Sequence, residues 1–299
     1  MPELPDITVY LEALAPRVLD HPLLGLRITS PFVLRSVEPA PSELVGRRVT
    51  RLDRMGKRIV FGFEGELFLV LHLMIAGRLK WLEPAAPVPR KVGLAAWDFA
   101  HGTLVLTEAG ARRRASIYLV RGEQALEDHA RGGLEVLESS LAEFTEALKR
   151  ENHTLKRSLT DPRLFSGIGN AYSDEILHRA RLSPVRLTRQ LTDPEIATLH
   201  RATRDVLTEW IDRLRRETGG GFPAKVTAFR EGMAVHGRFG KPCPVCDAPV
   251  QRIRYASNET NYCATCQTGG RLLADRSLSR LLKEDWPRSL EEMDELRRK

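Results

Sequence analysis

The sequence contains few cysteines and no long apolar segment. The four cysteines all lie between positions 243 and 266, so they do not form the scattered disulfide framework of a small secreted protein. The longest apolar run, LFLVLHLMIAG, is interrupted by His72 and is shorter than the roughly 18 residues that a membrane span requires. The amino terminus has acidic residues within its first six positions and lacks the basic start of a signal peptide. We therefore expect a soluble cytoplasmic protein without a membrane partner.

The composition is that of an ordinary globular protein with a basic excess. Its 299 residues are enough for two domains, each with its own core. Lys and Arg outnumber Asp and Glu by 46 to 39, which gives a net charge of +7 and a pI near 9.4. This balance favours a polyanionic partner, although a basic protein with no nucleic-acid role has the same composition.

Hydrophobic periodicity divides the chain into a β-rich part and a helical part, with no internal repeat. Residues 4–19 carry an apolar stripe at helical spacing through Ile7, Leu11, Leu14 and Val18. Short β-like runs between about 23 and 120 predict an antiparallel sandwich or barrel-like domain. Helical patterns follow, and a GGGF segment at 219–222 ends the longest of them. The expected helices lie at 141–150, 153–160, 170–180 and 194–217, with two more in the tail at 276–284 and 289–298.

The cysteines form two CxxC pairs separated by sixteen residues. Four thiolates at this spacing can surround one tetrahedral Zn²⁺, and the run VQRIRYASNETNY between them predicts a β-hairpin. Two disulfides or four reduced thiols are the alternatives. A site with four sulfur ligands has no open coordination position, so the expected single zinc ion is structural. Arg252 and Arg254 alternate on one face of the hairpin, where they either grip phosphates or form solvated surface.

The chain starts with MPELPDITVY, and this start has two interpretations. Pro2 and Pro5 can simply introduce a helix, since proline fits the first helical turn. Alternatively, removal of Met1 leaves Pro2 as a free secondary amine with Glu3 as its neighbour.

Three further features are weak when taken alone. In SGIGNAYSDEIL, at 166–177, two glycines precede a helix whose free N–H groups attract phosphate, and Asn170 is a natural cap residue. Lys57 follows Gly56 in a turn between strands, where most lysines are solvent-exposed. His72 also fits an ordinary hydrogen-bonded core histidine.

In combination these motifs are specific. PELP, the turn lysine, HL-x-x-x-G, GIGN-x-Y-x-x-E and CxxC…CxxCQ occur in one order, and the chain over about residues 2–267 resembles the formamidopyrimidine-DNA glycosylase/endonuclease VIII family as a divergent member. The resemblance implies an α+β multidomain fold with DNA bound in the cleft between two lobes. The expected parts are an N-terminal catalytic β-sandwich with a leading helix at 2–121, a linker at 122–138, a helix–two-turns–helix domain at 139–222, a zinc ribbon at 223–268 and a charged helical tail at 269–299.

The resemblance also implies the activity and the residues that carry it. The expected enzyme is a bifunctional DNA glycosylase and abasic-site lyase of base-excision repair, which removes a damaged, oxidised base and cleaves the strand by β,δ-elimination. Its catalytic residues are Pro2 as nucleophile, Glu3 as acid/base partner and Lys57 beside the lesion. The expected DNA contacts are His72, Ile75, Arg112, Arg113, Lys156, Asn170, Arg252, Arg254 and Asn258. The expected zinc ligands are Cys243, Cys246, Cys263 and Cys266.

The sequence departs from the family pattern at positions that the resemblance implies contact the DNA beside the damaged base. Asn258 stands where the family ribbon carries an arginine, and Ile75 stands at the position of an inserted methionine. The segment ARRRAS at 111–116 has no aromatic wedge, although Arg112, Arg113 or Arg114 can fill the gap. About thirty residues follow the ribbon and offer a surface for packing or for a protein partner. We expect a nucleoid-associated monomer that binds damaged duplex DNA, with a non-catalytic DNA-damage binder and a zinc-ribbon interaction protein as alternatives.

Overall fold

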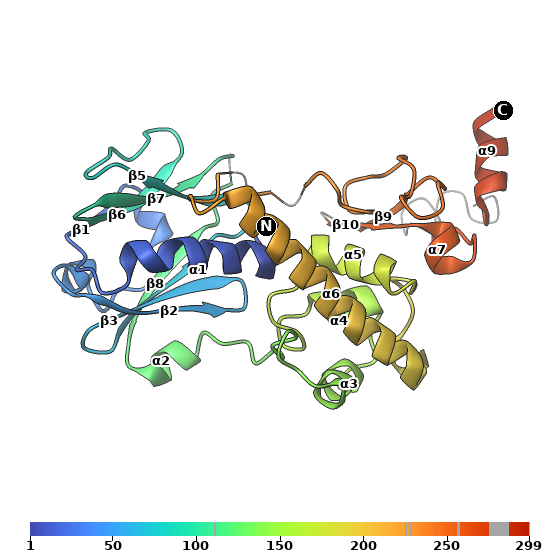
Figure 1. Ribbon diagram of the computed structural model, residues 1–299, viewed down its shortest axis with the longest axis horizontal. Coiled ribbons are helices and arrows are strands. Elements are labelled where there is room, and N and C mark those ends of the chain that lie inside the picture. The colour runs from blue at the N-terminus through green and yellow to red at the C-terminus, as the bar shows by residue number, and fades with distance from the viewer. Residues whose placement is uncertain (111, 225, 228, 256–257, 275–286, 299) are drawn as a thin grey trace. The chain divides into compact units, whose positions relative to one another are not determined.

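The chain consists of two compact units (Figure 1). The structure is a computed structural model, and it describes residues 1–110, 112–224, 226–227, 229–255, 258–274 and 287–298. Unit 1 comprises Met1–Gly132 and Glu209–Ala228, and unit 2 comprises Gly133–Thr208 and Phe229–Lys299. Among the described residues, no helix has both the length and the apolar character needed to cross a membrane.

Unit 1 begins with helix α1 (Leu4–Val18), which confirms the helix predicted at 4–19. Ile7, Leu14 and Val18 of the predicted apolar stripe are fully buried, since they recur on one face of the helix. Asp6 accepts a hydrogen bond from the Glu3 N–H at 2.9 Å and so satisfies one of the free donors at the helix start. The amino terminus is therefore a fixed part of the fold.

Two four-stranded antiparallel sheets follow, which confirms the predicted β-sandwich. One sheet has the strand order β1-β6-β7-β5 and the other has the order β2-β3-β4-β8. The strands are β1 (Gly25–Ile28), β2 (Val49–Met55), β3 (Arg58–Phe63), β4 (Leu67–His72), β5 (Gly77–Leu82), β6 (Gly93–Phe99), β7 (Gly102–Glu108) and β8 (Ser116–Arg121). Short 3-10 helices at Pro31–Val33 and Pro41–Leu44 lie in the connections.

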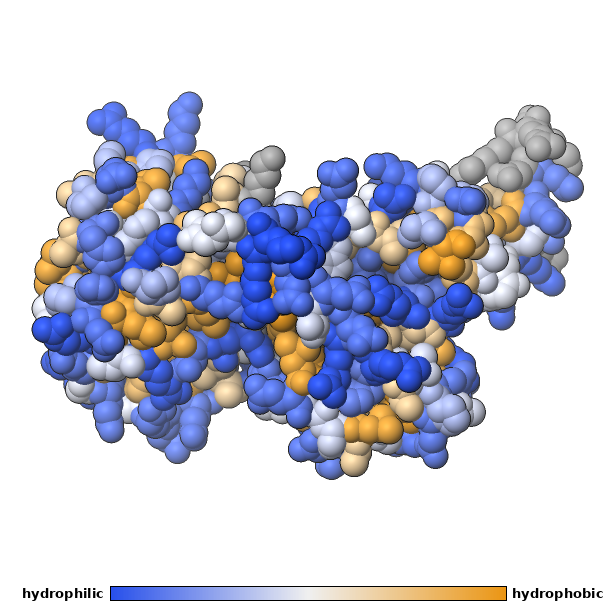
Figure 2. Space-filling view, in the orientation of Figure 1, coloured by the Kyte–Doolittle hydropathy of each residue, from blue (hydrophilic) through white to orange (hydrophobic). Residues whose placement is uncertain are grey.

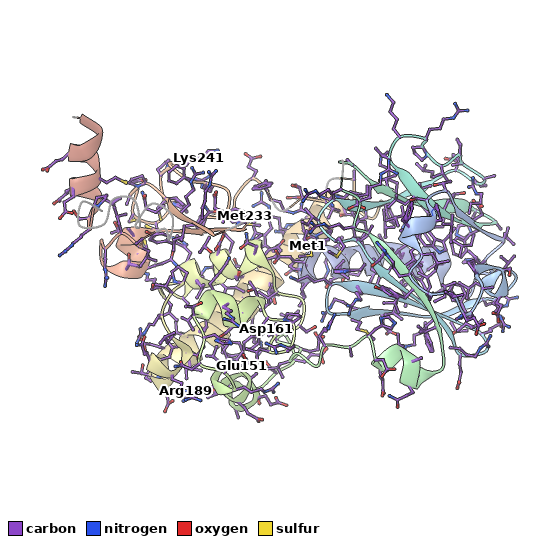
Figure 3. The ribbon with its side chains drawn as sticks, turned by 180° about the vertical axis from the view of Figure 1, so that it is seen from behind. Met1, Glu151, Asp161, Arg189, Met233 and Lys241 are labelled. Carbon is purple, nitrogen blue, oxygen red and sulfur yellow. The ribbon has the colours of Figure 1, made fainter. Side chains whose placement is uncertain are left out.

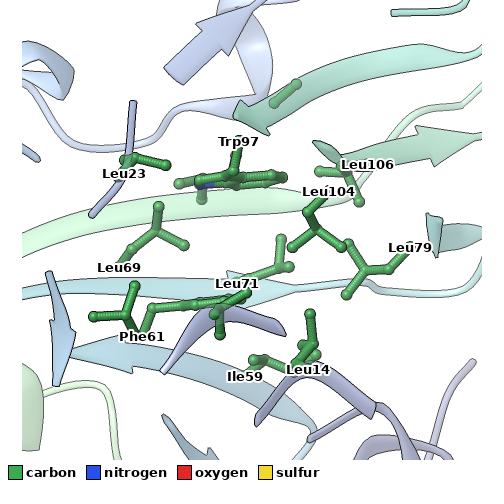
Figure 4. Close-up of a cluster of buried hydrophobic side chains, with 14 of the residues drawn as sticks. Leu14, Leu23, Ile59, Phe61, Leu69, Leu71, Leu79, Trp97, Leu104 and Leu106 are labelled. Carbon is green, nitrogen blue, oxygen red and sulfur yellow. The ribbon is translucent and has the colours of Figure 1, made fainter. Parts of the chain in front are cut away.

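The core of unit 1 lies between the sheets and under α1 (Figure 4). Alternate residues of each strand point to one face, so β3 contributes Phe61 and β4 contributes Leu69 and Leu71. Trp97 of β6 lies parallel to Phe61, with ring centroids 6.4 Å apart. By contrast, Figure 2 shows a largely hydrophilic surface on the viewed face, with hydrophobic residues in small separate patches.

Unit 2 contains the predicted helices α3 (Leu141–Lys149), α4 (Leu155–Thr160) and α5 (Asn170–Arg179). A capping box fixes the start of α3, where Ser140 accepts a hydrogen bond from the Glu143 N–H and the Glu143 carboxylate accepts one from the Ser140 N–H. A 3-10 helix at Thr188–Gln190 precedes the long helix α6 (Asp193–Thr218). The expected linker also contains a short helix that the sequence did not suggest, α2 (Glu123–Glu127).

The division of the chain differs from the predicted boundary at residue 222. Helix α6 ends before Gly219 and Gly220, which both have positive φ, as the GGGF segment predicts. Its last part nevertheless belongs to unit 1, together with the residues up to Ala228. The reason is tertiary: Arg215 forms an ion pair with Glu12 of α1 at 2.6 Å, and Phe222 packs on the ring of Tyr10.

The predicted hairpin between the cysteine pairs consists of β9 (Gln251–Tyr255) and β10 (Asn258–Tyr262), followed by helix α7 (Ala264–Thr268). The tail packs on this hairpin. Leu272, Leu290 and Met293 surround the buried Tyr262, whose hydroxyl accepts a hydrogen bond from the Leu273 N–H at 2.7 Å. Helix α9 (Leu290–Arg298) matches the pattern predicted at 289–298, whereas the pattern at 276–284 lies outside the described residues.

Candidate active site and zinc centre

The first residues of the chain form a buried, hydrogen-bonded start of α1. Pro2 is buried, and Glu3, which precedes the helix as its N-cap residue, is only 2% exposed. The Glu3 carbonyl accepts the Ile7 N–H at 3.0 Å, while its N–H donates to Asp6. Figure 3 labels Met1 at this end of the helix. A nucleophile at the amino terminus would therefore be held in place.

Burial and nearby charges set the basicity of the terminal amine. Burial lowers the pKa of the Met1 amine below its ordinary value, and the charges that act on it are Glu3 and Asp6, which raise its pKa, and Arg78 and Lys57, which lower it. The net effect is a lower pKa, so more of the amine is neutral near pH 7 than in a free peptide. Removal of Met1 would place the secondary amine of Pro2 one residue further along the same buried start of α1.

Lys57 lies in a tight turn that joins two strands of the core. Gly56 and Lys57 form the two-residue connection between β2 and β3, and Gly56 has φ +62°, as the first central residue of a type II′ turn requires. Arg58, the next residue, pairs with His72 at the end of β4. Lys57 and His72 therefore lie at the same end of this sheet, and their joint role in one site stays a prediction.

His72 lies half-buried among positive charges. Burial is the main cause that lowers its pKa to about 4, and the positive charges of Arg58, Lys57 and Arg131 contribute to the same shift. The imidazole is therefore neutral at pH 7. A neutral ring can accept or donate a hydrogen bond at a phosphate without adding another charge to a cationic corner.

This shift predicts a pH dependence of stability. Between about pH 6.5 and pH 4 the unfolded chain binds a proton on this histidine while the folded protein does not. The free energy of unfolding therefore decreases as the pH falls through this window, and the His72 contribution is constant below about pH 4. We expect His72→Asn to flatten this part of the profile, measured by urea unfolding from pH 4 to pH 7. A variant with the same slope as the wild type would contradict the assignment.

The predicted wedge residue Ile75 is on the surface of unit 1. Its side chain is 57% exposed in the turn between β4 and β5, next to Met74, which has φ +53°. Arg78 holds this turn, because one of its guanidinium nitrogens donates to the Ile75 carbonyl at 3.2 Å and to the Gly77 carbonyl at 2.7 Å. A Cβ on Gly77 would lie 2.3 Å from the Leu73 carbonyl oxygen, so the turn requires glycine there.

The arginine segment after β7 is also at the surface. Arg112 and Arg113 are exposed, and Arg113 donates to the Lys91 carbonyl. The buried carboxylate of Glu108 anchors the end of the segment by accepting the N–H groups of Arg114 and Ala115 at 2.8 and 2.9 Å. Arg112 and Arg113 are therefore exposed to solvent, and the backbone that follows them is held in place by Glu108.

Two predicted DNA contacts of unit 2 have partners within the protein. The expectation that Asn170 caps α5 is wrong: Gly169 is the N-cap residue, and the Asn170 amide donates to the Glu259 carbonyl of β10 at 2.9 Å. Asn170 is the first helical residue, so its side chain is free to reach across to the hairpin. Lys156 donates to the Asn170 carbonyl at 2.6 Å and to the Asp174 carboxylate at 2.5 Å.

The hairpin arginines share one face, as their alternation predicts. Arg252 and Arg254 lie 3.4 and 3.5 Å from the same Glu259 carboxylate. The Arg252 guanidinium also stacks on the Phe239 ring at 4.1 Å, whereas Arg254 is the more exposed of the two. Asn258 is the first residue of β10 and pairs with Tyr255; its side chain lies outside the described part.

The four cysteines form one cluster that fits a structural zinc ion. Their Sγ atoms all lie within 4.8 Å of one another, and none of them forms a disulfide. Sulfur pairs at 3.4–3.9 Å are close to the roughly 3.8 Å edge of a tetrahedron with Zn–S bonds of about 2.3 Å. The Cys266 N–H donates to Cys263 Sγ, and His178 Nε2 of α5 lies 3.3 Å from Cys243 Sγ. Such contacts orient the ligands and stabilise thiolate charge.

Sequence reasoning missed Arg78 and Asp174. Arg78 follows the HL-x-x-x-G motif directly, and its position at the start of a strand gave no functional signal. Asp174 lies four residues after Asn170 in a predicted helix, so helical spacing alone places the two side chains on one face. That signal was present in the sequence.

Three family models match the chain, in the order of its parts. The "Formamidopyrimidine-DNA glycosylase N-terminal domain" matches residues 1–117, the "Formamidopyrimidine-DNA glycosylase H2TH domain" matches 133–219, and the "Zinc finger found in FPG and IleRS" matches 240–269. Together with the sandwich, the helices and the four-cysteine cluster, they define a zinc-finger DNA glycosylase of the H2TH class.

Similarity to individual formamidopyrimidine-DNA glycosylases agrees with the family models. The chain is 37% identical over 282 residues to the formamidopyrimidine-DNA glycosylase of Thermus thermophilus, covering 90% of this chain and all of that protein. It is similar to the crystal structure of the Thermus thermophilus protein, with a TM-score of 0.73, 34% identity and coverage of 89% and 98%. It is also similar to Lactococcus lactis Fpg in complex with DNA containing an abasic site, with a TM-score of 0.78, 26% identity and coverage of 89% and 99%.

The chain belongs to the formamidopyrimidine-DNA glycosylase family. As a member, it is classed with the DNA glycosylases of base-excision repair, and the family's zinc finger and the four clustered sulfurs give it one structural zinc ion.

Proposed function

We infer that this chain is a bifunctional enzyme, which removes an oxidised base from duplex DNA and then cleaves the strand at the abasic site. The observation that carries this proposal is the buried start of α1. There burial lowers the pKa of the Met1 amine, and the charges of Glu3, Arg78 and Lys57 act on it. The amine of Pro2 takes up this chain start when Met1 is removed. A buried, partly neutral amine is a competent nucleophile at neutral pH.

The reaction begins when Pro2, exposed by removal of Met1, uses its nitrogen lone pair to attack C1′ of the damaged nucleotide. The new N–C1′ bond forms as the glycosidic bond breaks, and the base leaves with that bond's electron pair. The N–H proton that Pro2 loses on forming the bond balances the proton that the base takes up. Glu3 donates a proton to O4′ as the sugar ring opens, which leaves a cationic iminium between Pro2 and C1′. Because Pro2 is a secondary amine, the iminium carries its positive charge without further protonation.

The iminium then drives strand cleavage. It withdraws electrons from C2′, so a base removes a C2′ proton and the 3′ phosphate leaves with the electron pair of its C–O bond. In a second elimination the C4′ proton is removed, and the 5′ phosphate leaves with the electron pair of its own C–O bond. Hydrolysis of the final iminium by water frees the amine of Pro2, releases the sugar remnant as an aldehyde and restores the enzyme. Glu3 is the group placed to carry protons between these steps, and Lys57 supplies positive charge beside the departing phosphates.

Each unit contributes groups suited to DNA. In unit 1, Lys57 and neutral His72 suit phosphate contacts, and exposed Ile75, Arg112 and Arg113 suit filling the space that a flipped nucleotide leaves. In unit 2, Asn170 and the hairpin arginines Arg252 and Arg254 suit the phosphate backbone. A mutant of Lactococcus lactis Fpg has been solved with DNA containing Fapy-dG, and Lactococcus lactis Fpg has been solved with abasic-site DNA. An oxidised purine is therefore the first substrate to test here.

Borohydride trapping tests the chemistry. Purified protein, with Met1 removal confirmed by mass spectrometry, is incubated with duplexes that contain an abasic site, an oxidised purine or an oxidised pyrimidine. We expect a covalent adduct with the abasic duplex and with the substrate lesion. The matched control is the same protein with one residue retained before Pro2, which blocks the amine and is expected to abolish the adduct. Tight binding without an adduct on any duplex would instead favour a non-catalytic DNA-damage binder.

A further inference from the structure

One face of helix α5 holds the zinc ribbon through polar side chains one turn apart. Asn170, Asp174 and His178 follow each other at four-residue spacing, so they lie along the same face. Asn170 donates to the Glu259 carbonyl in β10, and His178 lies 3.3 Å from the Cys243 sulfur. The helix that begins at a predicted phosphate contact thus reaches both the hairpin and a zinc ligand.

Asp174 is the centre of this face. Its side chain is completely buried, yet its carboxylate accepts hydrogen bonds from three different segments: Lys156 Nζ of α4 at 2.5 Å, His236 Nδ1 at 2.8 Å, and the Asn261 N–H of β10 at 3.2 Å. A buried charge is stable only when it is paired and hydrogen-bonded, as it is here. Asp174 therefore holds four parts of unit 2 together: α4, α5, the segment around His236 before the first cysteine, and the hairpin.

Lys156 faces into the protein. Its side chain is 12% exposed, and its ammonium group donates to Asp174 and to the backbone carbonyl of Asn170 at 2.6 Å. The resemblance to the family implies that this lysine faces DNA. Here its charge is compensated by a buried carboxylate, and two of its three donors are directed at α5.

We propose that Lys156 and Asp174 are a positioning pair, which sets Asn170 and the hairpin for phosphate binding, and that Lys156 does not itself contact a phosphate. Lys156 holds the backbone of Asn170 while Asp174 holds β10, so the two phosphate-binding elements cannot shift independently. The proposal rests on the proposed function, because it assumes that Asn170 and the hairpin bind DNA.

Salt dependence separates a positioning residue from a phosphate ligand. Each phosphate contact by a cation changes the slope of log K against log[salt] by about 0.9, because the contact releases a counterion. The experiment measures binding of a duplex with a tetrahydrofuran abasic-site analogue by fluorescence anisotropy, at several NaCl concentrations. The variants are Lys156→Gln, Asp174→Asn and the double variant, which keeps the local charge balanced and the side-chain shapes similar.

We expect each single variant to weaken binding by roughly 5- to 100-fold, and the double variant to be no weaker than the worse single variant, because both changes remove one interaction. The slope of the double variant should equal that of the wild type. Arg254→Gln is the positive control and should make the negative slope shallower by about 0.9. Lys149→Gln, at an exposed ion pair with Asp193, is the negative control.

A negative slope that is about 0.9 shallower in the double variant than in the wild type would overturn the proposal, because it would show that Lys156 releases a counterion. Additive losses from the two single variants would also overturn it. If Lys156→Gln does not fold, Lys156→Arg keeps both donors and should retain the affinity and slope of the wild type, whereas Asp174→Asn alone should not retain the affinity. Wild-type protein that binds the duplex without salt dependence would instead contradict the proposed function.

Discussion

Replacing Glu3 by Gln is expected to lower base excision by roughly 10²- to 10⁴-fold, the usual contribution of a general acid or base. Gln has nearly the same shape as Glu but cannot donate or accept a proton at this position. Glu3 is 2% exposed, so bulk water has little access to replace it. Single-turnover excision from a lesion duplex measures the effect. Trapping on a pre-formed abasic site should fall less, since no glycosidic bond has to break there.

Asp6→Asn is the matched control for this prediction. Asp6 lies in the same first turn, is 3% exposed, and accepts the Glu3 N–H through an oxygen that Asn also has. We expect the Asn variant to lose less than about tenfold in excision. Equal losses of excision rate in both variants would show that excision depends on negative charge at the start of α1. That result would contradict an acid/base role for Glu3.

Most secondary structure was predictable because it is encoded locally. Short, nearly continuous apolar runs such as KRIVFGF and ELFLVLHL located β3 and β4, and the apolar stripe at helical spacing located α1. The spacing of the cysteines predicted both the hairpin and the cluster of sulfurs. In these cases the spacing of residues in the sequence matches the geometry of the strand, helix or metal site that they form.

The features that could not be predicted depend on residues far apart in the chain. The pairing of Arg215 with Glu12 joins positions 203 residues apart, and it assigns the end of α6 to unit 1. Asn170 was expected to cap its own helix, but a carbonyl of β10 is its partner. Likewise, no local pattern reveals that Lys156 is neutralised by Asp174. Charge counts and secondary-structure propensities do not predict which distant residue a polar side chain contacts in the folded protein.

Loss of the zinc site is expected to produce the largest effect on DNA binding. The double variant Cys246→Ser and Cys266→Ser should fall from one bound zinc per chain to none, measured by metal analysis after dialysis. Structural zinc sites contribute apparent binding free energies of about 10–16 kcal/mol in small domains. An isolated two-stranded hairpin is marginal in water, so β9 and β10 should unfold without the metal. We expect affinity for abasic-analogue duplex to fall by roughly 100-fold or more.

The same variant should leave unit 1 folded, because the described members of the sandwich core all lie outside the cysteine-bearing segment at 243–266. Val245→Ser is the matched control, since Val245 is an exposed non-ligand between two of the cysteines. Calorimetry should show one retained transition for unit 1, and residual borohydride trapping should persist at high protein concentration because the amine, Glu3 and Lys57 all belong to unit 1. A variant that retains one zinc would contradict the four-sulfur assignment. Complete loss of trapping with unit 1 still folded would mean that the ribbon takes part in the chemistry itself.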